Sequence, residues 1–250
     1  DRRRSEVYTG ERCVVLRKGG VDDSKTVRYS GRMRIVSIVI IAATILALPA
    51  FGQDWALHRI EDQADLRETS EARIAEGFTP VGLDISADLG LTVLYARLGA
   101  WEADSYAIEE IPSLDLLNEV VTSRIREGWF PMDFSFSGES NALLFTSSED
   151  VIDGWRLIST EASTIEVQKT IAEYQTEGFT PVGISALENG QLALLLLDLP
   201  EQETPAPIIM GVSKDPEEAV VAIQSTVEDG WTPLSVTTTD SQMIVLFLRL

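Results

Sequence analysis

The chain has one cysteine and one histidine in 250 residues, which leaves little material for catalysis or metal binding. Cys13 lies near the start, so the chain beyond it has no thiol for a disulfide, a nucleophile or a thiolate metal site. A Ser-His-Asp enzyme would have to use His58, which stands in a strand-like segment and is better explained as a surface histidine. Neither a Gly-x-Ser-x-Gly turn nor a phosphate-binding loop occurs. The sequence therefore predicts no catalytic residue, no cofactor and no metal site.

Basic side chains are also scarce, and they are unevenly placed. The chain has 40 acidic and 20 basic residues, and residues 1–52 hold ten of the basic residues but only five of the acidic ones. The rest of the chain therefore carries a net charge of −25, from ten basic and 35 acidic side chains. Such a body repels phosphate backbones, so no nucleic-acid partner is expected. An acid-rich, lysine-poor surface also suits surroundings of high salt.

Residues 33–52 have the parts of a secretory signal peptide: a basic start, an apolar run and small residues before a cleavage point after Gly52. Residues 1–32 are then an upstream or disordered leader. The alternative is an uncleaved membrane anchor, but the 17 residues at 35–51 include Pro49 and are at the short limit for a bilayer span. The predicted location is the periplasm or the exterior of a bacterium, with no stable membrane span after cleavage.

One short motif recurs four times in the predicted mature chain. An acid and a glycine are followed by an aromatic residue, one further residue, a proline and an aliphatic residue, and the glycines are 51, 50 and 52 positions apart. Self-similarity at a fixed period is typical of a repeat architecture. The recurring positions, which we expect to be mainly structural, are Glu76, Gly77, Phe78, Pro80, Glu127, Gly128, Trp129, Pro131, Glu177, Gly178, Phe179, Pro181, Asp229, Gly230, Trp231 and Pro233.

Each motif stands at the same place in a unit of about fifty residues. A strand-like segment comes first, followed by a helix with apolar residues three and four apart, the motif strand, a polar turn and a last apolar strand. The predicted fold class is α+β: four tandem β-α-β-β repeats, with antiparallel sheets and helices packed on one face. The predicted units are residues 53–98, 104–148, 154–199 and 207–250.

Helix boundaries and strand burial are also encoded locally. The motif glycines are expected to end the helices, because glycine takes the left-handed conformation without strain. Ser163 with Glu166 forms a capping box, and Pro216 suits a first helical position. The last strands of the third and fourth units, at 192–197 and 244–248, are apolar on both faces. Their second face must therefore be covered by a neighbouring unit, through sheet-to-sheet or continuous-sheet packing, which predicts one compact body.

The repeat resembles a small bacterial domain family of unknown function with a Glu-Gly-Trp-Glu-Leu-Val signature. That resemblance rests on the β-α-β-β order, the aromatic residue in the first strand and the helix that ends in Glu-Gly-Trp or Glu-Gly-Phe. It covers nearly the whole predicted mature chain, although Thr-Pro replaces Glu-Leu and the fourth unit has Asp229 in place of Glu. The resemblance implies the fold and brings no activity or catalytic residue with it.

The recurring acids and tryptophans leave alternatives open. An acid in the last turn of a helix opposes the helix dipole, so each carboxylate needs a compensating partner. The structural interpretation is a hydrogen bond from nearby backbone or from a Trp N–H. The functional alternatives are binding of Ca²⁺ or of a cationic ligand, or an acid and base pair as in a glycosidase. Trp55, Trp129, Trp155, Trp231 and Trp101 are expected to anchor the core, with an aromatic ligand groove as the alternative.

The sequence therefore favours an exported, non-enzymatic repeat protein of the cell envelope that serves as a binding or structural module. Its expected partner is a protein, a peptide or a glycan, because grooves form readily between packed repeats. The alternative is a hydrolase that uses carboxylates in a cleft between repeats. Two acids about 5 to 10 Å apart in a deep pocket would favour that alternative.

Overall fold

A computed structural model describes residues 8–9, 54–86, 90–98, 103, 105–136, 141–147, 151–199, 206–214, 216–239 and 242–249. The predicted leader and signal peptide lie outside these residues, apart from Tyr8–Thr9 (β1), and so do Cys13, Trp101 and most of the predicted polar turns. Among the described helices, none is both long enough and apolar enough to cross a bilayer.

Four β-α-β-β units follow one another, as the repeat predicts. The first comprises β2 (Trp55–Ile60), α1 (Gln63–Ala75), β3 (Thr79–Ser86) and β4 (Gly90–Ala96), and the second β5 (Tyr106–Glu110), η1 (Leu114–Leu116), α2 (Leu117–Arg126), β6 (Trp129–Phe136) and β7 (Asn141–Ser147). The third comprises β8 (Gly154–Glu161), α3 (Thr164–Gln175), β9 (Phe179–Ala186) and β10 (Gln191–Asp198), and the fourth β11 (Ile208–Ser213), α4 (Pro216–Glu228), β12 (Thr232–Thr239) and β13 (Gln242–Leu248).

Each unit forms its own antiparallel sheet, in which the last strand lies between the first and the second. β1 adds a short fourth strand beside β8. The fold class and the four repeats are therefore confirmed. The helix ends are confirmed too, because the glycine after each helix has a positive φ, which is +82° at Gly77 and +92° at Gly178. Ser163 accepts a hydrogen bond from the amide of Glu166 at the start of α3, and Asp62 caps α1 in the same way.

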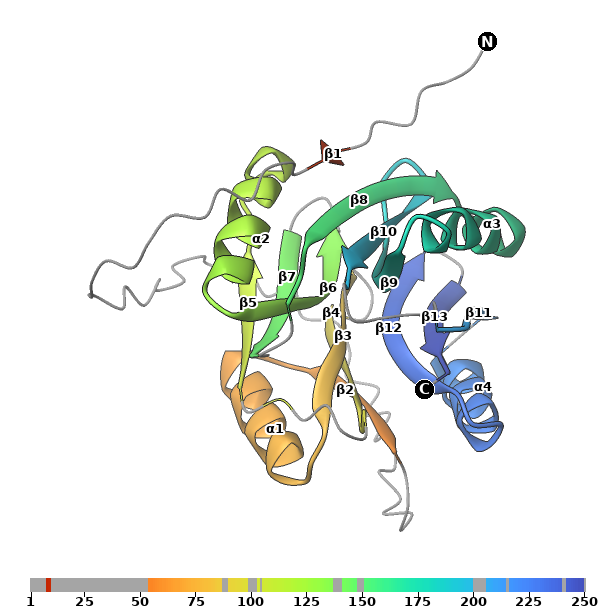
Figure 1. The fold of residues 1–250 in the computed structure, drawn as a ribbon. Helices are drawn as coiled ribbons and strands as arrows, with labels where there is room; N and C mark the ends of the chain where they lie inside the picture. Colours follow the sequence, from red (N-terminus) through yellow and green to blue (C-terminus); the bar gives the residue numbers. More distant parts are fainter. Residues whose placement is uncertain are drawn as a thin grey trace, which may run out of the picture. The chain divides into compact units, whose positions relative to one another are not determined.

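The second strands of the four units meet around one axis. β3 lies beside β6, β6 beside β9, β9 beside β12, and β12 beside β3 again, so the four strands close a ring. Figure 1 shows these strands in the centre and the four helices at the outside. The amides of Leu83 and Ile85 donate to side chains at Asp133 and Ser135, so two steps along β3 match two steps along β6 in the same direction. Neighbouring strands of the ring are therefore parallel.

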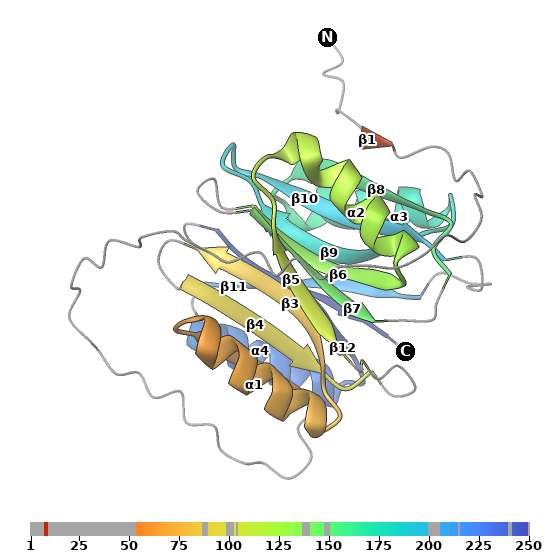
Figure 2. The ribbon, with the colours of Figure 1, turned by 90° about the vertical axis from the view of Figure 1, so that its left-hand side faces the viewer.

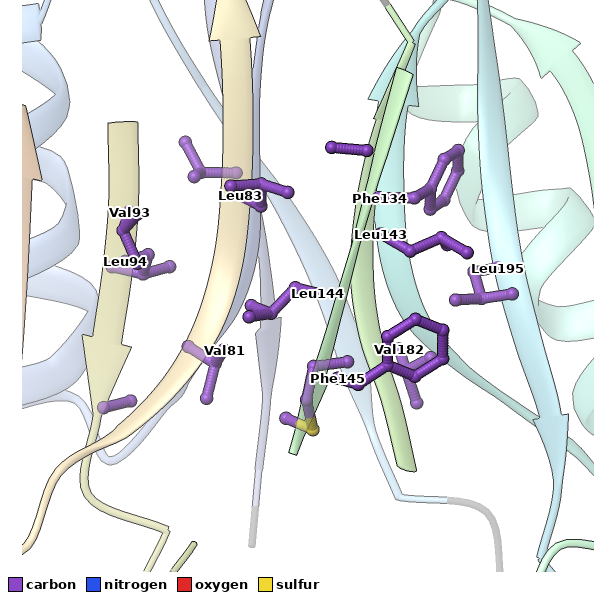
Figure 3. Close-up of a cluster of buried hydrophobic side chains, with 14 of the residues drawn as sticks. Val81, Leu83, Val93, Leu94, Phe134, Leu143, Leu144, Phe145, Val182 and Leu195 are labelled. Atoms are coloured by element: carbon purple, nitrogen blue, oxygen red, sulfur yellow. The ribbon is translucent and has the colours of Figure 1, made fainter. Parts of the chain in front are cut away.

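Each sheet is covered on one face by its own helix and on the other by the preceding unit. In Figure 3, Leu144 of the second unit points toward Leu83 of the first, while Leu195 of the third faces Phe134 and Phe145 of the second. The same relation closes the ring, because Trp55 Nε1 of the first unit donates to Gln224 of α4 over 3.3 Å. Figure 2 shows α1 outside the sheet of β3 and β4. The last strands are buried on both faces, as predicted.

Of the two expected ways of joining the units, the structure has sheet-to-sheet packing and not a continuous sheet. The described strands form four separate sheets, and the ring strands are connected by side chains rather than by a backbone ladder. One compact body is nevertheless formed by the four units. At these edges several amides donate to side chains of the neighbouring ring strand in place of a backbone ladder, namely those of Leu83, Ile85, Phe136, Ile184, Ala186 and Thr238.

Candidate functional site

The recurring motif lies at one end of the ring, where the parallel ring strands begin. Each motif acid follows a helix, and in the first three units its carboxylate binds an arginine: Arg73 with Glu76 over 2.7 Å, and Arg156 with Glu177 over 2.6 Å. In the second unit Arg124 binds both Glu127 and Glu109. The three recurring carboxylates of these pairs are slightly more than half exposed. These ion pairs offset the unfavourable position of an acid at a helix C-terminus.

An arginine guanidinium lies over the ring face of each motif aromatic. In the second and third units it is the arginine that binds the motif acid, and in the first unit Arg97 lies there as well as Arg73. The guanidinium of Arg97 lies 4.4 Å from the ring centre of Phe78, and Arg156 lies 4.2 Å from that of Phe179. Arg124 and Arg249 cover the two tryptophans of the motif in the same way: Arg124 lies over Trp129 and Arg249 over Trp231. We call these four groups the rim clusters.

The rim clusters correct the expected partner of the recurring acids. Their carboxylates accept from arginines, not from backbone or Trp N–H groups as the sequence suggested. In the fourth unit Arg249 donates to the backbone oxygen of Asp229 instead. The arginine comes from the helix, the first strand or the residue after the last strand, which is why no fixed spacing reveals it. Within the described ranges, no three His, Cys, Asp or Glu side chains gather as a metal would require.

His58 is half-buried and is not a free surface residue. Its Nε2 accepts a hydrogen bond from Arg73 over 3.0 Å, and its ring meets the edge of Tyr95. Burial, followed by the charge of Arg73, lowers the pKa of His58. The imidazole is therefore held neutral as part of the packing of the first unit. Trp55 and Trp155 are buried in the core as expected, whereas the two motif tryptophans are only partly buried.

The axis of the ring holds polar residues that the sequence did not single out. The residues two positions after the motif prolines are Gly82, Asp133, Gly183 and Ser235, which we call the axis layer. Asp133 is fully buried, and its carboxylate accepts from the amide of Leu83 over 2.8 Å, from the hydroxyl of Ser235 over 2.8 Å and from the amide of Ile184 over 3.2 Å. One carboxylate thus joins all four units.

The glycines of the axis layer make room for this carboxylate. A β-carbon at Gly183 would lie 2.6 Å from Oδ1 and 3.1 Å from Cα of Asp133. At Gly82 it would lie 3.1 Å from the amide nitrogen of Val236. The alternation of glycine with Asp133 or Ser235 is therefore steric: the side chains of the second and fourth units fill the space that glycine leaves in the first and third.

A second polar layer lies two residues further along the ring strands. Asp84 accepts through Oδ1 from the amide of Thr238 and the hydroxyl of Thr237, and among the described residues its Oδ2 has no hydrogen-bond partner. Ser135 and Ser185 accept from amides of the preceding units. Burial raises the pKa of Asp84, and it raises the pKa of Asp133 well above its usual range, with Asp84 adding to that effect. These layers bind the units together.

Only an alignment of the four units would have revealed the axis layer. The signal is an acid inside an apolar strand, at Met132-Asp133-Phe134, opposite glycine in the first and third units. A buried acid in such a strand needs donors from elsewhere. The axis residues differ from unit to unit, so recurrence does not mark them.

Two open cavities lie at the surface of the described residues. The wider one, of about 430 Å³, runs along α2 and is lined by Glu109, Leu116, Glu119, Val120, Ser123, Arg124 and Glu127. The other, of about 170 Å³, lies where the fourth unit meets the first, a junction that we call the seam. Its lining residues are Asp54, Arg97, Val227, Gly230, Trp231, Thr232 and Pro233.

At other junctions of the ring, the place equivalent to the seam cavity is occupied by the linker between the two units. Thr79 in the first unit is equivalent to Thr232, and its hydroxyl accepts from the amide of Ala103, a buried linker residue. Gln175 in the third unit is equivalent to Val227, and it donates over 2.8 Å to the carbonyl of the linker residue Ala206. At the seam no linker connects the two units, since the fourth ends the repeat array and the first begins it.

No protein-family model matches the chain, and a search of curated proteins finds no match either.

Proposed function

We propose that the chain is an exported, non-enzymatic binding module of the bacterial cell envelope, and that the seam cavity is its binding site. One observation carries the proposal: at other junctions of the ring the chain's own linker is seated against the preceding unit, whereas the seam leaves an open cavity. The cavity combines a tryptophan, an arginine and a carboxylate around a small apolar floor, which suits a ligand with both apolar and polar parts.

The repeat supports a relation to the small bacterial family with the Glu-Gly-Trp-Glu-Leu-Val signature. Each unit has the β-α-β-β order, a helix that ends before a positive-φ glycine and an aromatic residue directly after it. In this chain four such units close one ring, so surfaces that a single unit would expose are buried between neighbours.

The acids have tasks in the structure that compete with a hydrolytic one. The rim carboxylates are paired with arginines, and Asp133 accepts three hydrogen bonds from other units. A hydrolase needs one acid held protonated and one free to act as a base or nucleophile beside the substrate. The seam cavity contains one carboxylate, Asp54, which faces Arg97 over 3.8 Å. The carboxylate-dependent hydrolase is therefore the less supported alternative.

Export is tested by expressing the chain in a bacterial host and sequencing the N-terminus of the periplasmic product. Cleavage after Gly52 predicts Gln53 as the first residue. Recovery of the whole chain in the membrane fraction would contradict cleavage and favour an anchor.

Binding is tested by a pull-down from envelope extract with the mature chain, at about 0.15 M and about 1 M salt. A partner that uses the seam should persist at high salt, because apolar contacts are not screened. It should also be lost with Val227→Phe, which fills the cavity. A partner retained by that variant and released by salt would contradict the proposal.

A further inference from the structure

We infer that the seam cavity binds an extended peptide segment that carries a small apolar residue, and that Thr232 accepts a hydrogen bond from the backbone amide of that residue. The inference rests on the proposed function and specifies its ligand. It is drawn from the pseudo-symmetry of the ring, which shows at other junctions what the equivalent surface holds.

The register of the units identifies the equivalent positions. The carbonyl of the residue just before each first strand accepts from the residue after the last strand: Asp54 from Arg97, and Pro207 from Arg249. Ser105 likewise accepts from Ser147. Counting back two residues from Ser105 gives Ala103. In the third unit Trp155 pairs with Leu197 as Tyr106 pairs with Thr146, so Gly154 is equivalent to Ser105 and the same count gives Ile152.

The linker residues at this position are seated against the preceding unit. Ala103 is 5% exposed and donates its amide to Thr79 over 3.3 Å. Ile152 is half-buried and packs against the main hydrophobic core. One position later in the fourth unit, the carbonyl of Ala206 accepts from Gln175. The surface that holds these linker residues, which we call the linker seat, thus takes a small or medium apolar side chain. Its side chains also form hydrogen bonds with the linker backbone.

The seam has residues at the positions that form the linker seat elsewhere in the ring. Thr232 and Val227 stand where Thr79 and Gln175 stand, and Trp231 forms a wall beside them. The sequence position that corresponds to Ala103 is Gly52, the last residue of the predicted signal peptide. Cleavage after Gly52 therefore removes that position from the mature chain. A cavity of about 170 Å³ then matches one such residue of a partner peptide.

The charged side chains at the cavity also suit a peptide ligand. Asp54 and Arg97 both line the cavity, with 62% and 43% of their side chains exposed. A peptide backbone offers an N–H to the carboxylate and a carbonyl to the guanidinium within one residue, so an extended segment can satisfy both. The ligand class is therefore a polypeptide in extended conformation.

The probe is an acetylated, amidated peptide that copies residues 101–105 of this chain, Trp-Glu-Ala-Asp-Ser. It is titrated into the ¹⁵N-labelled mature chain, residues 53–250, and amide shifts are followed by NMR. We expect saturable shifts at Gly230, Thr232 and the indole N–H of Trp231. A peptide with arginine in place of the alanine should not bind. A peptide with N-methylalanine should bind about fivefold more weakly, because it lacks the donor.

Three variants locate the site on the protein. Thr232→Val should weaken binding about fivefold, whereas Thr79→Val removes the equivalent hydroxyl under the chain's own linker and should leave peptide binding unchanged. Val227→Phe should abolish binding, and its dispersed NMR spectrum verifies folding. The absence of saturable shifts, or equal binding of the arginine peptide, would overturn the inference.

Sedimentation of the mature chain gives a separate outcome. A dimer that Val227→Phe dissociates would assign the cavity to a second copy and overturn the peptide inference. A failed titration combined with a salt-resistant, identified partner would overturn this inference alone and leave the binding function in place.

Discussion

The rim clusters stand where the ring strands begin and the axis layer lies within those strands, and the two differ in almost every other respect. The rim repeats nearly the same residues in every unit, and the carboxylates of its ion pairs are about half exposed. The axis layer consists of Gly82, Asp133, Gly183 and Ser235. The polar side chains of Asp133 and Ser235 are fully buried. Exposed ion pairs contribute little to stability, whereas a buried polar group that loses its partner costs much more. Recurrence in the sequence is therefore a poor guide to energetic weight in this protein.

The largest expected effect is a steric change at the axis. Gly183→Ala places a β-carbon 2.6 Å from Asp133 Oδ1, where the backbone of β6 limits relaxation. We expect a loss of about 3 kcal/mol in the free energy of unfolding, measured by urea denaturation. Gly154→Ala is the matched control, because its nearest neighbour would be 3.8 Å away. Equal effects of the two substitutions would show that the close approach at the axis does not matter.

The second effect concerns the carboxylate that joins the units. Asp133→Ala leaves the amide of Leu83 without its acceptor, and it should destabilise the chain by about 2 kcal/mol. Ser235→Ala should cost less, about 1 kcal/mol, since the amide of Ile184 keeps Asp133 as an acceptor. Denaturation of both variants beside the wild type tests the order. A larger loss for Ser235→Ala would contradict the central role of Asp133.

The third effect is a pH dependence of stability that arises from a buried acid of the ring strands. The pKa of Asp84 is raised by burial, so its protonated form favours the folded state. Its contribution to stability is complete below the unfolded pKa of about 3.9 and is lost as the pH rises through the folded pKa. Asp84→Asn keeps the acceptor of Thr238 and removes the titration.

Asp84→Asn should therefore lose less stability than the wild type between about pH 4 and pH 8. Urea midpoints at several pH values measure the difference. Asp133 is the acid that interacts with this group, and its own raised pKa keeps some dependence in the variant. If the urea midpoints of the wild type and of Asp84→Asn changed equally with pH, Asp84 would not titrate in this range.

The smallest expected effect lies at the rim. Arg156→Ala removes the ion pair with Glu177 and the cation from the face of Phe179, and it should cost about 1 kcal/mol at low salt. The coupling between Arg156 and Glu177, obtained from a double-mutant cycle, should fall further at high salt because the carboxylate is exposed. A coupling that matches the loss at Asp133 would remove the distinction between rim and axis.

Much of each unit could be read locally. Each unit begins with the strand that the repeat pattern predicted, and glycine ends each helix where the motif placed it. The partner of the motif acids was predicted wrongly, since arginines from three different elements serve one position. Because the arginine has no fixed position relative to the motif acid, no regular sequence spacing reveals the pair.

The sequence by itself determined the number of units, their order of helix and strands, and the need of each sheet for a second cover, because these follow from periodicity and from glycine and proline at fixed positions. Only the tertiary structure decided that the units close a ring. Closure depends on how Asp133 fits against glycine in neighbouring units and on Trp55 reaching Gln224, contacts between residues up to 169 positions apart. It also decided that an open cavity lies at the seam, where no linker joins the two units.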